Sequence, residues 1–196
     1  MPLQDRILGH FQASAQATLD AAARLAPLID EGSGLILNCL TQGGKILACG
    51  NGASAASAQV FAALMVNRLE HERPGLAAIA LAADTSILTS IADDHGYDQV
   101  FARQIKALGL PGDVLLVLTD GANLPGMLAA VDAAHARGMS VIAMTGRDGG
   151  AVAEQMRDGD VLMCVPAETD ARIHEIHLLS LHCLCDAVDS ILLGVE

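Results

Sequence analysis

The sequence is poor in aromatic residues and in positive charge, and each shortage excludes a class of protein. Only 2% of the 196 residues are aromatic, with no tryptophan and one tyrosine, which excludes an aromatic platform for stacking nucleic-acid bases. Lysine and arginine number 11 against 23 aspartates and glutamates, for a formal net charge of −12. A protein that grips phosphate backbones needs a positive footprint. We therefore expect no direct contact with nucleic acid.

Targeting and membrane segments are also missing from the sequence. The first residues include Asp5 and His10 and contain no continuous apolar run, so they do not read as a signal peptide. No run reaches the roughly 20 apolar residues of a membrane helix. The five cysteines form no CxxC pair, which is typical of a reducing compartment. We expect a cytoplasmic protein with no membrane partner.

Apolar residues are abundant, at 52% of the chain. This content is too high for disorder, and 196 residues suit one domain of roughly 100–200 residues. An apolar excess at this size also predicts that surface is buried between subunits.

Short apolar runs alternate with amphipathic stretches along the chain. Apolar residues recur at helical spacing over residues 4–29 and 31–42, and Gly43-Gly44 ends the second stretch, so we predict a helical hairpin within residues 1–43. Five apolar runs read as buried strands: 45–49, 77–82, 114–118, 140–144 and 161–165. Helical stretches follow near 52–68, 86–107, 124–137, 150–157 and 170–193. This alternation predicts an α/β fold over residues 44–196, with three layers and a doubly wound, parallel, five-stranded sheet of flavodoxin type.

The first candidate site is the turn Gly50-Asn51-Gly52-Ala53-Ser54 after the first strand. Ligands of open α/β sheets bind beyond the carboxyl ends of the strands. Glycines permit a tight turn, Ser54 suits a helix cap, and the helix N-terminus attracts anions. The turn indicates a phosphate or sugar-phosphate site, with a purely structural glycine turn as the alternative. It also fits the dinucleotide pattern G-x-G-x-x-A, but Glu70 and Glu72 precede the next strand, where a solvated loop is the simpler interpretation.

A second candidate is the loop 118–123, where Thr119 and Asn123 offer hydrogen bonds. Asp120 places a negative charge in the same loop and would repel a phosphate. We expect Asp120 to cap the following helix.

A third candidate is the cluster His174-Glu175-Ile176-His177 together with His182 on the last helix. Histidines and a carboxylate suggest a metal site, but the cluster lacks the H-E-x-x-H spacing of zincins. Packed core histidines are the simpler interpretation. Glu175 is the one acid that we place near the candidate site.

Blocks along nearly the whole chain resemble the sugar isomerase (SIS) domain, within the branch that holds phosphoheptose isomerases and DnaA initiator-associating proteins. The blocks are Cys49-Gly50-Asn51-Gly52-Ala53-Ser54, Asn67-Arg68, Glu72-Arg73-Pro74, Gly112-Asp113-Val114-Leu115-Leu116, Thr145-Gly146-Arg147-Asp148-Gly149-Gly150, Ala171-Arg172-Ile173-His174-Glu175-Ile176-His177 and Cys183-Leu184-Cys185-Asp186. The resemblance implies a homotetramer whose sites use residues of neighbouring subunits.

The resemblance also implies roles for single positions. The isomerases use an asparagine-glycine turn, a phosphate loop rich in serine and threonine, and a His, Glu, Gln, His set for zinc in which the glutamate is the catalytic base. The positions that match the turn and phosphate-binding loops are Asn51, Gly52, Ser54, Asp94, Thr119 and Asn123. The positions that match the zinc set hold Val60, Leu64, His174 and His182.

Valine and leucine can neither accept a proton nor bind a metal, and aldose–ketose isomerisation needs a positioned base. We therefore expect no zinc, and no catalysis from this site. The expectation that follows is a non-catalytic protein that binds the replication initiator DnaA through Leu192 and Leu193, with subunit packing as the alternative role of these leucines. The alternative function is a phosphosugar-binding protein or a phosphoheptose isomerase with a rearranged site that uses His174, Glu175 and His182.

Overall fold

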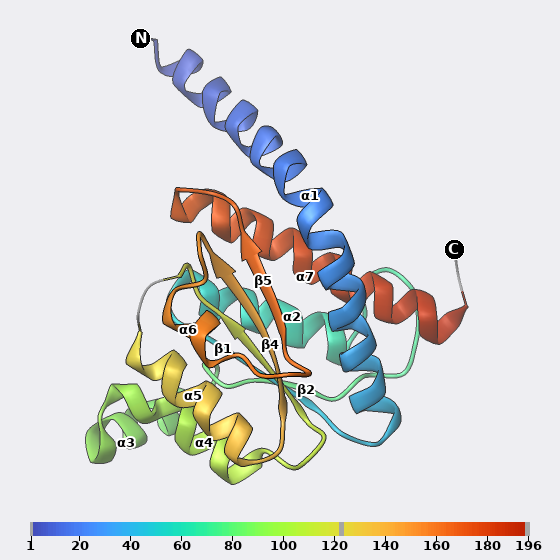
Figure 1. Ribbon diagram of the computed structural model, residues 1–196, viewed down its shortest axis with the longest axis vertical. Coiled ribbons are helices and arrows are strands. Elements are labelled where there is room, and N and C mark those ends of the chain that lie inside the picture. The colour runs from blue at the N-terminus through green and yellow to red at the C-terminus, as the bar shows by residue number, and fades with distance from the viewer. Residues whose placement is uncertain (1, 122–123, 195–196) are drawn as a thin grey trace.

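Five parallel strands form the centre of the computed structural model, which describes residues 2–121 and 124–194 (Figure 1). The strands are β1 (Ile46–Gly50), β2 (Ala78–Ala80), β3 (Val114–Leu118), β4 (Ser140–Gly146) and β5 (Val161–Val165). Their order in the sheet is β2-β1-β3-β4-β5. The order reverses direction between β1 and β3, as in flavodoxin-like folds. The predicted α/β class, the parallel sheet and its five strands are confirmed.

Helices cover both faces of the sheet. They are α1 (Leu3–Thr41), α2 (Ala53–Val66), α3 (Thr85–His95), α4 (Val100–Leu108), α5 (Pro125–Ala136), α6 (Gly150–Gln155) and α7 (Asp170–Leu193), with a short 3-10 helix at Tyr97–Gln99. One face packs against α1, α2 and α7 and the other against the remaining helices, so each face has its own hydrophobic core. The alternation of side chains along a strand supplies both cores: Ile46 and Ala48 of β1 face one, and Leu47 and Cys49 face the other.

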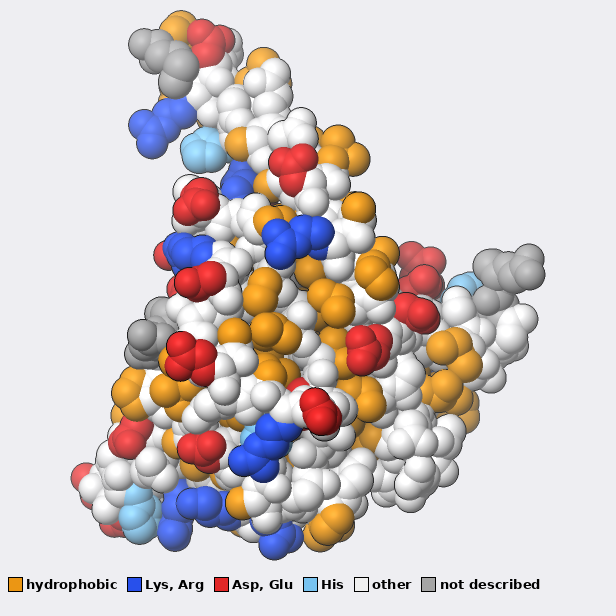
Figure 2. Space-filling view, viewed as in Figure 1, with side chains coloured by type: hydrophobic (Ala, Val, Ile, Leu, Met, Phe, Trp, Pro, Cys, Tyr) orange, Lys and Arg blue, Asp and Glu red, His pale blue; other side chains and the backbone are white. Residues whose placement is uncertain are grey.

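The N-terminal segment is one helix and not the predicted hairpin. α1 runs unbroken for 39 residues, about 58 Å at 1.5 Å per residue, and its first half extends beyond the rest of the chain (Figure 1). Gly32, inside this helix, allows close packing, because a Cβ atom there would lie 2.8 Å from Cε of Met163 and 3.3 Å from Cδ2 of Leu184. Apolar side chains remain exposed on the projecting half (Figure 2).

Two further differences concern helices. The stretch 86–107, predicted as one helix, is divided into α3, the short 3-10 helix and α4, with Gly96 at φ 88° between them. Among the described residues, α7 is long and apolar enough to cross a membrane by length and composition alone. Its buried side chains, among them Ile173, Leu181 and Leu184, belong to the core shared with α1 and α2, which accounts for its hydropathy.

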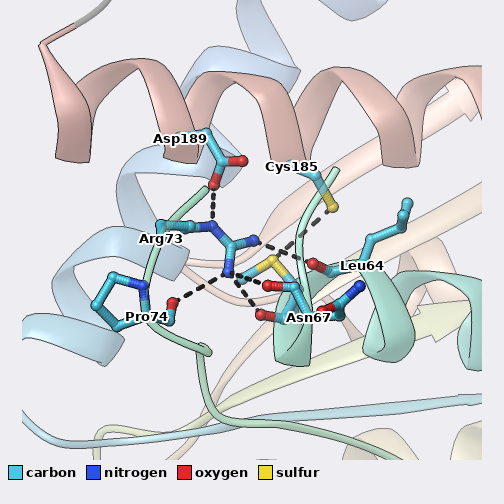
Figure 3. A network of polar contacts seen from close by, with 7 residues as sticks. Leu64, Asn67, Arg73, Pro74, Cys185 and Asp189 are labelled. Carbon is cyan, nitrogen blue, oxygen red and sulfur yellow. Dashed lines mark hydrogen bonds and ion pairs between the residues drawn. The ribbon is translucent and has the colours of Figure 1, made fainter. Parts of the chain in front are cut away.

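A buried ion pair ties the end of α2 to α7 (Figure 3). Nε of Arg73, in the loop after α2, donates to the carboxylate of Asp189 on α7, and the two side chains are 1% and 2% exposed. The guanidinium also donates to four backbone carbonyls: those of Leu64, Met65, Asn67 and Pro74. Carbonyls at a helix C-terminus have no partner within the helix, so Arg73 supplies the hydrogen-bond donors that a further turn of α2 would have supplied.

We predict that Asp189→Asn lowers the free energy of unfolding by about 3–5 kcal/mol, because it leaves the Arg73 charge buried and without a counter-ion. Urea unfolding measures the change. The matched control is Glu72→Gln, which breaks the exposed ion pair with Arg68 (N–O 3.6 Å) and should change stability by less than about 1 kcal/mol. A similarly small effect of Asp189→Asn would contradict the importance given to the buried pair.

Candidate functional site

A cleft of about 260 Å³ lies where β1 and β3 end. Neighbouring parallel strands that leave the sheet toward opposite sides create such a crevice, the usual ligand site of this fold. Its lining comes from the turn after β1, the loop after β3 and the start of α7: Asn51, Gly52, Ala53, Ser54, Leu118, Thr119, Asp120, Leu124 and His174.

The N-terminus of α2 forms one wall. Gly52 precedes the helix at φ 56° and ψ −121°, a conformation that residues other than glycine rarely adopt. Within the described residues, nothing accepts a hydrogen bond from the amides of Gly52 and Ala53. These amides and the helix dipole favour an anion. Ser54 lies inside the first turn and is 3% exposed. It is not the helix cap as predicted, because Gly52 occupies the cap position.

Close packing holds this helix against the strand end. A Cβ atom at Gly50, the last residue of β1, would lie 2.8 Å from the backbone of Ser54. Glycine therefore lets the first turn of α2 sit directly beyond the strand. Cys49, the preceding residue, is no nucleophile, because burial raises the pKa of its thiol to about 12.

The loop after β3 forms the second wall. Thr119 is 2% exposed, and its buried Oγ1 has no hydrogen-bonding partner in the part of the chain that the structure describes. A buried hydroxyl without a partner is costly and suits a ligand in the cleft. Asp120 does not cap the next helix as predicted. α5 begins at Pro125, and its cap residue, Leu124, makes no side-chain bond.

The start of α7 contributes two histidines, only one of which reaches the cleft. His174 lines the cleft, and its buried Nδ1 has no partner among the described residues. His177 lies one turn further and is 1% exposed. Its Nε2 is 3.1 Å from the carbonyl of Thr145, so that nitrogen carries the proton and donates. Burial lowers the pKa of His177 to about 4, and its ring meets that of His174 edge to face at 6.4 Å between centroids.

We predict that His177 makes the protein less stable in mild acid. In the unfolded chain this histidine takes up a proton below its ordinary pKa of 6.5, whereas the folded chain keeps the ring neutral down to about pH 4. The free energy of unfolding therefore falls between about pH 6.5 and pH 4, by at most about 1.4 kcal/mol per pH unit for this one proton. Below about pH 4 the contribution is flat.

Urea unfolding at fixed protein concentration between pH 7 and pH 4 tests this expectation. His177→Asn should lose stability less steeply than the wild type in that window, and His71→Asn, on an exposed loop, is the matched control. Parallel curves for wild type and His177→Asn would show that the ring titrates normally in the folded chain.

The structure brings together some of the predicted site residues and separates others. Asn51, Gly52, Ser54 and Thr119 line one cleft, and Asn123 lies outside the described residues. Three others do not line it. Asp94 is exposed on α3 and His182 lies two turns beyond His174. The carboxylate of Glu175 instead accepts hydrogen bonds from Ser14 (2.7 Å) and Arg172 (2.5 Å).

Two residues at the cleft were not among the predicted site residues: Tyr97 and Leu124. The Tyr97 hydroxyl donates to Oδ1 of Asn51 at 3.2 Å and so orients the amide at the mouth of the cleft. Tyr97 is the only tyrosine of the chain, which is a signal in an aromatic-poor sequence. Leu124 lines the cleft, but an apolar residue in a loop gives no comparable signal.

The zinc site that the resemblance implies does not fit these residues. Val60 is 39% exposed on α2 and Leu64 packs on the core one turn later, and neither has a donor atom. That leaves His174 and His182, whereas structural and catalytic zinc sites use three or four protein ligands. Across residues 2–121 and 124–194, no group of three or more His, Cys, Asp or Glu side chains could hold a metal ion.

The fold and the cleft define a class of doubly wound α/β proteins with a ligand crevice at the carboxyl ends of the strands. The chain belongs to the SIS domain family, which matches residues 10–146. It is 69% identical over all 196 residues, and the full length of both chains, to a phosphoheptose isomerase of Thiobacillus denitrificans. It is 55% identical to one of Aromatoleum aromaticum, over 100% of this chain and 99% of that one.

Solved structures agree with this assignment. The phosphoheptose isomerase of Neisseria gonorrhoeae matches 96% of this chain and 100% of its own, with a TM-score of 0.92 and 48% identity. That of Francisella tularensis matches 97% and 100%, with a TM-score of 0.94 and 41% identity. The resemblance to the SIS family and its phosphoheptose isomerase branch is confirmed.

The expectation of a non-catalytic, DnaA-binding protein of replication initiation is wrong. Two relatives that match the full length of the chain are named phosphoheptose isomerase, and so is a solved structure that covers 96% of it, which supports the alternative interpretation. The prediction gave the missing metal ligand and base, at Val60 and Leu64, more weight than the resemblance of the rest of the chain to the isomerases. Leu192 and Leu193 lie at the exposed end of α7, 40% and 39% accessible, and lose their assignment to DnaA.

Proposed function

We propose that the chain binds a phosphorylated sugar of the phosphoheptose class in the cleft and interconverts its ketose and aldose forms. The observation that carries the proposal is the cleft itself, where the His174 imidazole lies together with the amides of Gly52 and Ala53 and the Thr119 hydroxyl, which have no partner among the residues that the structure describes. Amides and hydroxyls at a helix N-terminus suit a phosphate, and an imidazole suits proton transfer near neutral pH.

The proposed reaction moves one proton between adjacent carbons. In the open-chain ketose, a base removes a proton from C1 and the electron pair forms an enediol; the proton then returns at C2, while a hydroxyl proton passes from O1 to O2. Positioned bases contribute about 10²–10⁴-fold to such steps. His174 is the candidate base, because Nδ1 has no partner among the described residues. No step requires zinc, since the donor set does not suit it.

A second candidate function is phosphosugar binding without turnover. It is favoured by Val60 and Leu64, which stand where the resemblance implies a metal ligand and the catalytic base. The two candidates share the bound ligand and differ only in proton transfer.

We predict that sedoheptulose 7-phosphate binds with a Kd that Thr119→Val raises at least about tenfold, since a hydrogen bond to a charged group contributes about 1.5–3 kcal/mol and about 1.4 kcal/mol is tenfold. Isothermal titration calorimetry in EDTA measures it, with unphosphorylated sedoheptulose as the ligand control. Thr41→Val is the matched control variant, because the Thr41 hydroxyl bonds only carbonyls of its own helix, far from the cleft.

Deuterium exchange then separates turnover from binding. In D2O the isomerase should place deuterium on the carbons next to the carbonyl, detected by ¹H NMR, and His174→Gln should reduce the rate at least about a hundredfold with a smaller change in Kd. Binding without deuterium uptake would establish the second candidate. Absence of binding in the wild type would overturn both.

We also propose a homo-oligomer, expected to be the tetramer that the resemblance implies. Leu3, Phe11 and Leu19 on the projecting half of α1 are 72%, 72% and 70% exposed. Apolar side chains lie at intervals along this helix and form an exposed stripe (Figure 2). A long helix of one protomer can bury this stripe against that of another. The α2 helix is also largely apolar, with Val60 and Val66 exposed, as expected of a helix that a neighbour covers.

We predict that Phe11→Glu shifts the protein to smaller assemblies, because a charge replaces an apolar side chain within the buried stripe. Sedimentation velocity gives the mass, and Gln12→Glu, which adds the same charge at the next exposed position, is the control. An unchanged mass for Phe11→Glu would exclude this part of α1 from the interface.

A further inference from the structure

Arg147 is the one described non-glycine residue with a positive φ, at 57°. It directly follows Gly146, the last residue of β4. Left-handed backbone is strained for a residue with a side chain and persists where the surroundings impose it, often near functional sites. Arg147 does not line the cleft, so any role toward a ligand must act through other residues.

The side chain of Arg147 joins two of the segments that line the cleft, the loop after β3 and the start of α7. Nη1 donates to the carbonyl of Asp120 at 2.5 Å, in the loop after β3. Nη2 donates to the carbonyl of Glu168 at 3.1 Å and to Oδ1 of Asp170 at 2.5 Å. Glu168 and Asp170 flank the start of α7, and His174 follows Asp170 by one helical turn. One guanidinium therefore fastens the loop that carries Thr119 to the helix that carries His174.

The space between the loop after β3 and the start of α7 is tightly packed. A Cβ atom at Gly146 would collide with the side chain of Ile173 on α7 and lie 2.7 Å from the carbonyl of Asp120. A Cβ atom at Gly121 would lie 2.8 Å from the carbonyl of Gly146. Since these segments touch without free volume, a displacement of one moves its neighbours.

We propose that Arg147 is a positioning residue of the phosphosugar cleft, which sets the distance between the loop after β3 and the start of α7 through its bonds to Asp120 and Asp170. The inference rests on the proposed function, because the distance matters to a ligand that contacts Thr119 and His174 together. Such a fork of donors needs arginine, since lysine presents a single point charge.

A simpler role for Arg147 would be attraction of the phosphate by its positive charge. Asp170→Ala distinguishes the two roles, because it removes the oxygen that accepts from Nη2 of Arg147 and also removes a negative charge near the cleft. Attraction by charge alone predicts tighter binding by Asp170→Ala. Positioning predicts weaker binding, since the arginine loses the side-chain contact that holds it to α7.

Calorimetric titration with sedoheptulose 7-phosphate is the first test. Arg147→Ala should raise Kd about tenfold, Arg147→Lys should recover only part of that loss, and Asp170→Ala should raise Kd about threefold. Wild-type affinity in Arg147→Lys, or tighter binding by Asp170→Ala, would overturn the inference while leaving the proposed function intact.

Arg147→Gly separates positioning from stability. Glycine adopts φ 57° without strain, so this variant loses the bridge and gains a relaxed backbone. We expect its Kd to rise as in Arg147→Ala while its melting temperature stays at or above that of Arg147→Ala. Lower melting temperatures with an unchanged Kd in both variants would reduce Arg147 to a structural residue.

A measurement without sugar keeps the inference testable if the wild type binds no phosphosugar. Arg147→Ala should shift the amide NMR signals of both Thr119 and His174, neither of which is bonded to Arg147. Shifts confined to Asp120, Glu168 and Asp170 would show that the contacts of Arg147 do not determine the positions of Thr119 and His174.

Discussion

The buried pair of Arg73 and Asp189 fixes the relation between α2 and α7, the two helices on which the cleft depends (Figure 3). Both helices lie on the same face of the sheet and pack on each other. Burying two charges is expensive, and a buried pair need not stabilise a fold more than apolar residues of the same shape would. The pair instead fixes the position of α7 relative to α2. The guanidinium has its donors in a fixed plane, and they bind one carboxylate and four carbonyls. An apolar contact would allow α7 to slide along α2, whereas this set of hydrogen bonds has one register. The opposite ends of both helices contribute to the cleft, where Arg147 bridges α7 and the loop after β3 by the same means.

Local patterns in the sequence were enough for the sheet, because a buried parallel strand is a short apolar run bounded by turns. The runs 114–118 and 161–165 coincide with β3 and β5. The predicted hairpin is wrong because the two apolar stretches 4–29 and 31–42 belong to one continuous helix. Within this helix, Gly32 meets β5 and α7 at close range. That use of glycine depends on partners more than 100 residues away, which no local pattern reveals. The cap predictions for Ser54 and Asp120 failed for a related reason: each is a good capping residue, but the backbone starts its helix elsewhere.

The site was predictable only as far as strand topology fixes it. Residues after β1 and β3 had to meet, because the carboxyl ends of parallel neighbours share one edge, and Asn51, Gly52, Ser54 and Thr119 do so. Glu175 was misjudged, because one residue along a helix turns a side chain by about 100°, enough to send it to Ser14 on α1 while His174 faces the cleft. Arg147 could not be singled out, since its bonds span 21 to 27 residues and depend on a left-handed backbone.

Binding and proton transfer depend on different parts of this cleft, and the substitutions at Val60 and Leu64 bear on them unequally. The proposed anion site is built largely from backbone, the amides of Gly52 and Ala53, and from Thr119 beyond β3. Changing a side chain further along α2 leaves the position of these groups intact. Proton transfer depends on a side chain that accepts a proton at one point, and Val60 and Leu64 remove that chemistry from α2. In the proposed isomerisation the imidazole of His174 is therefore the group on which turnover depends, while affinity for a phosphate rests on the fold itself.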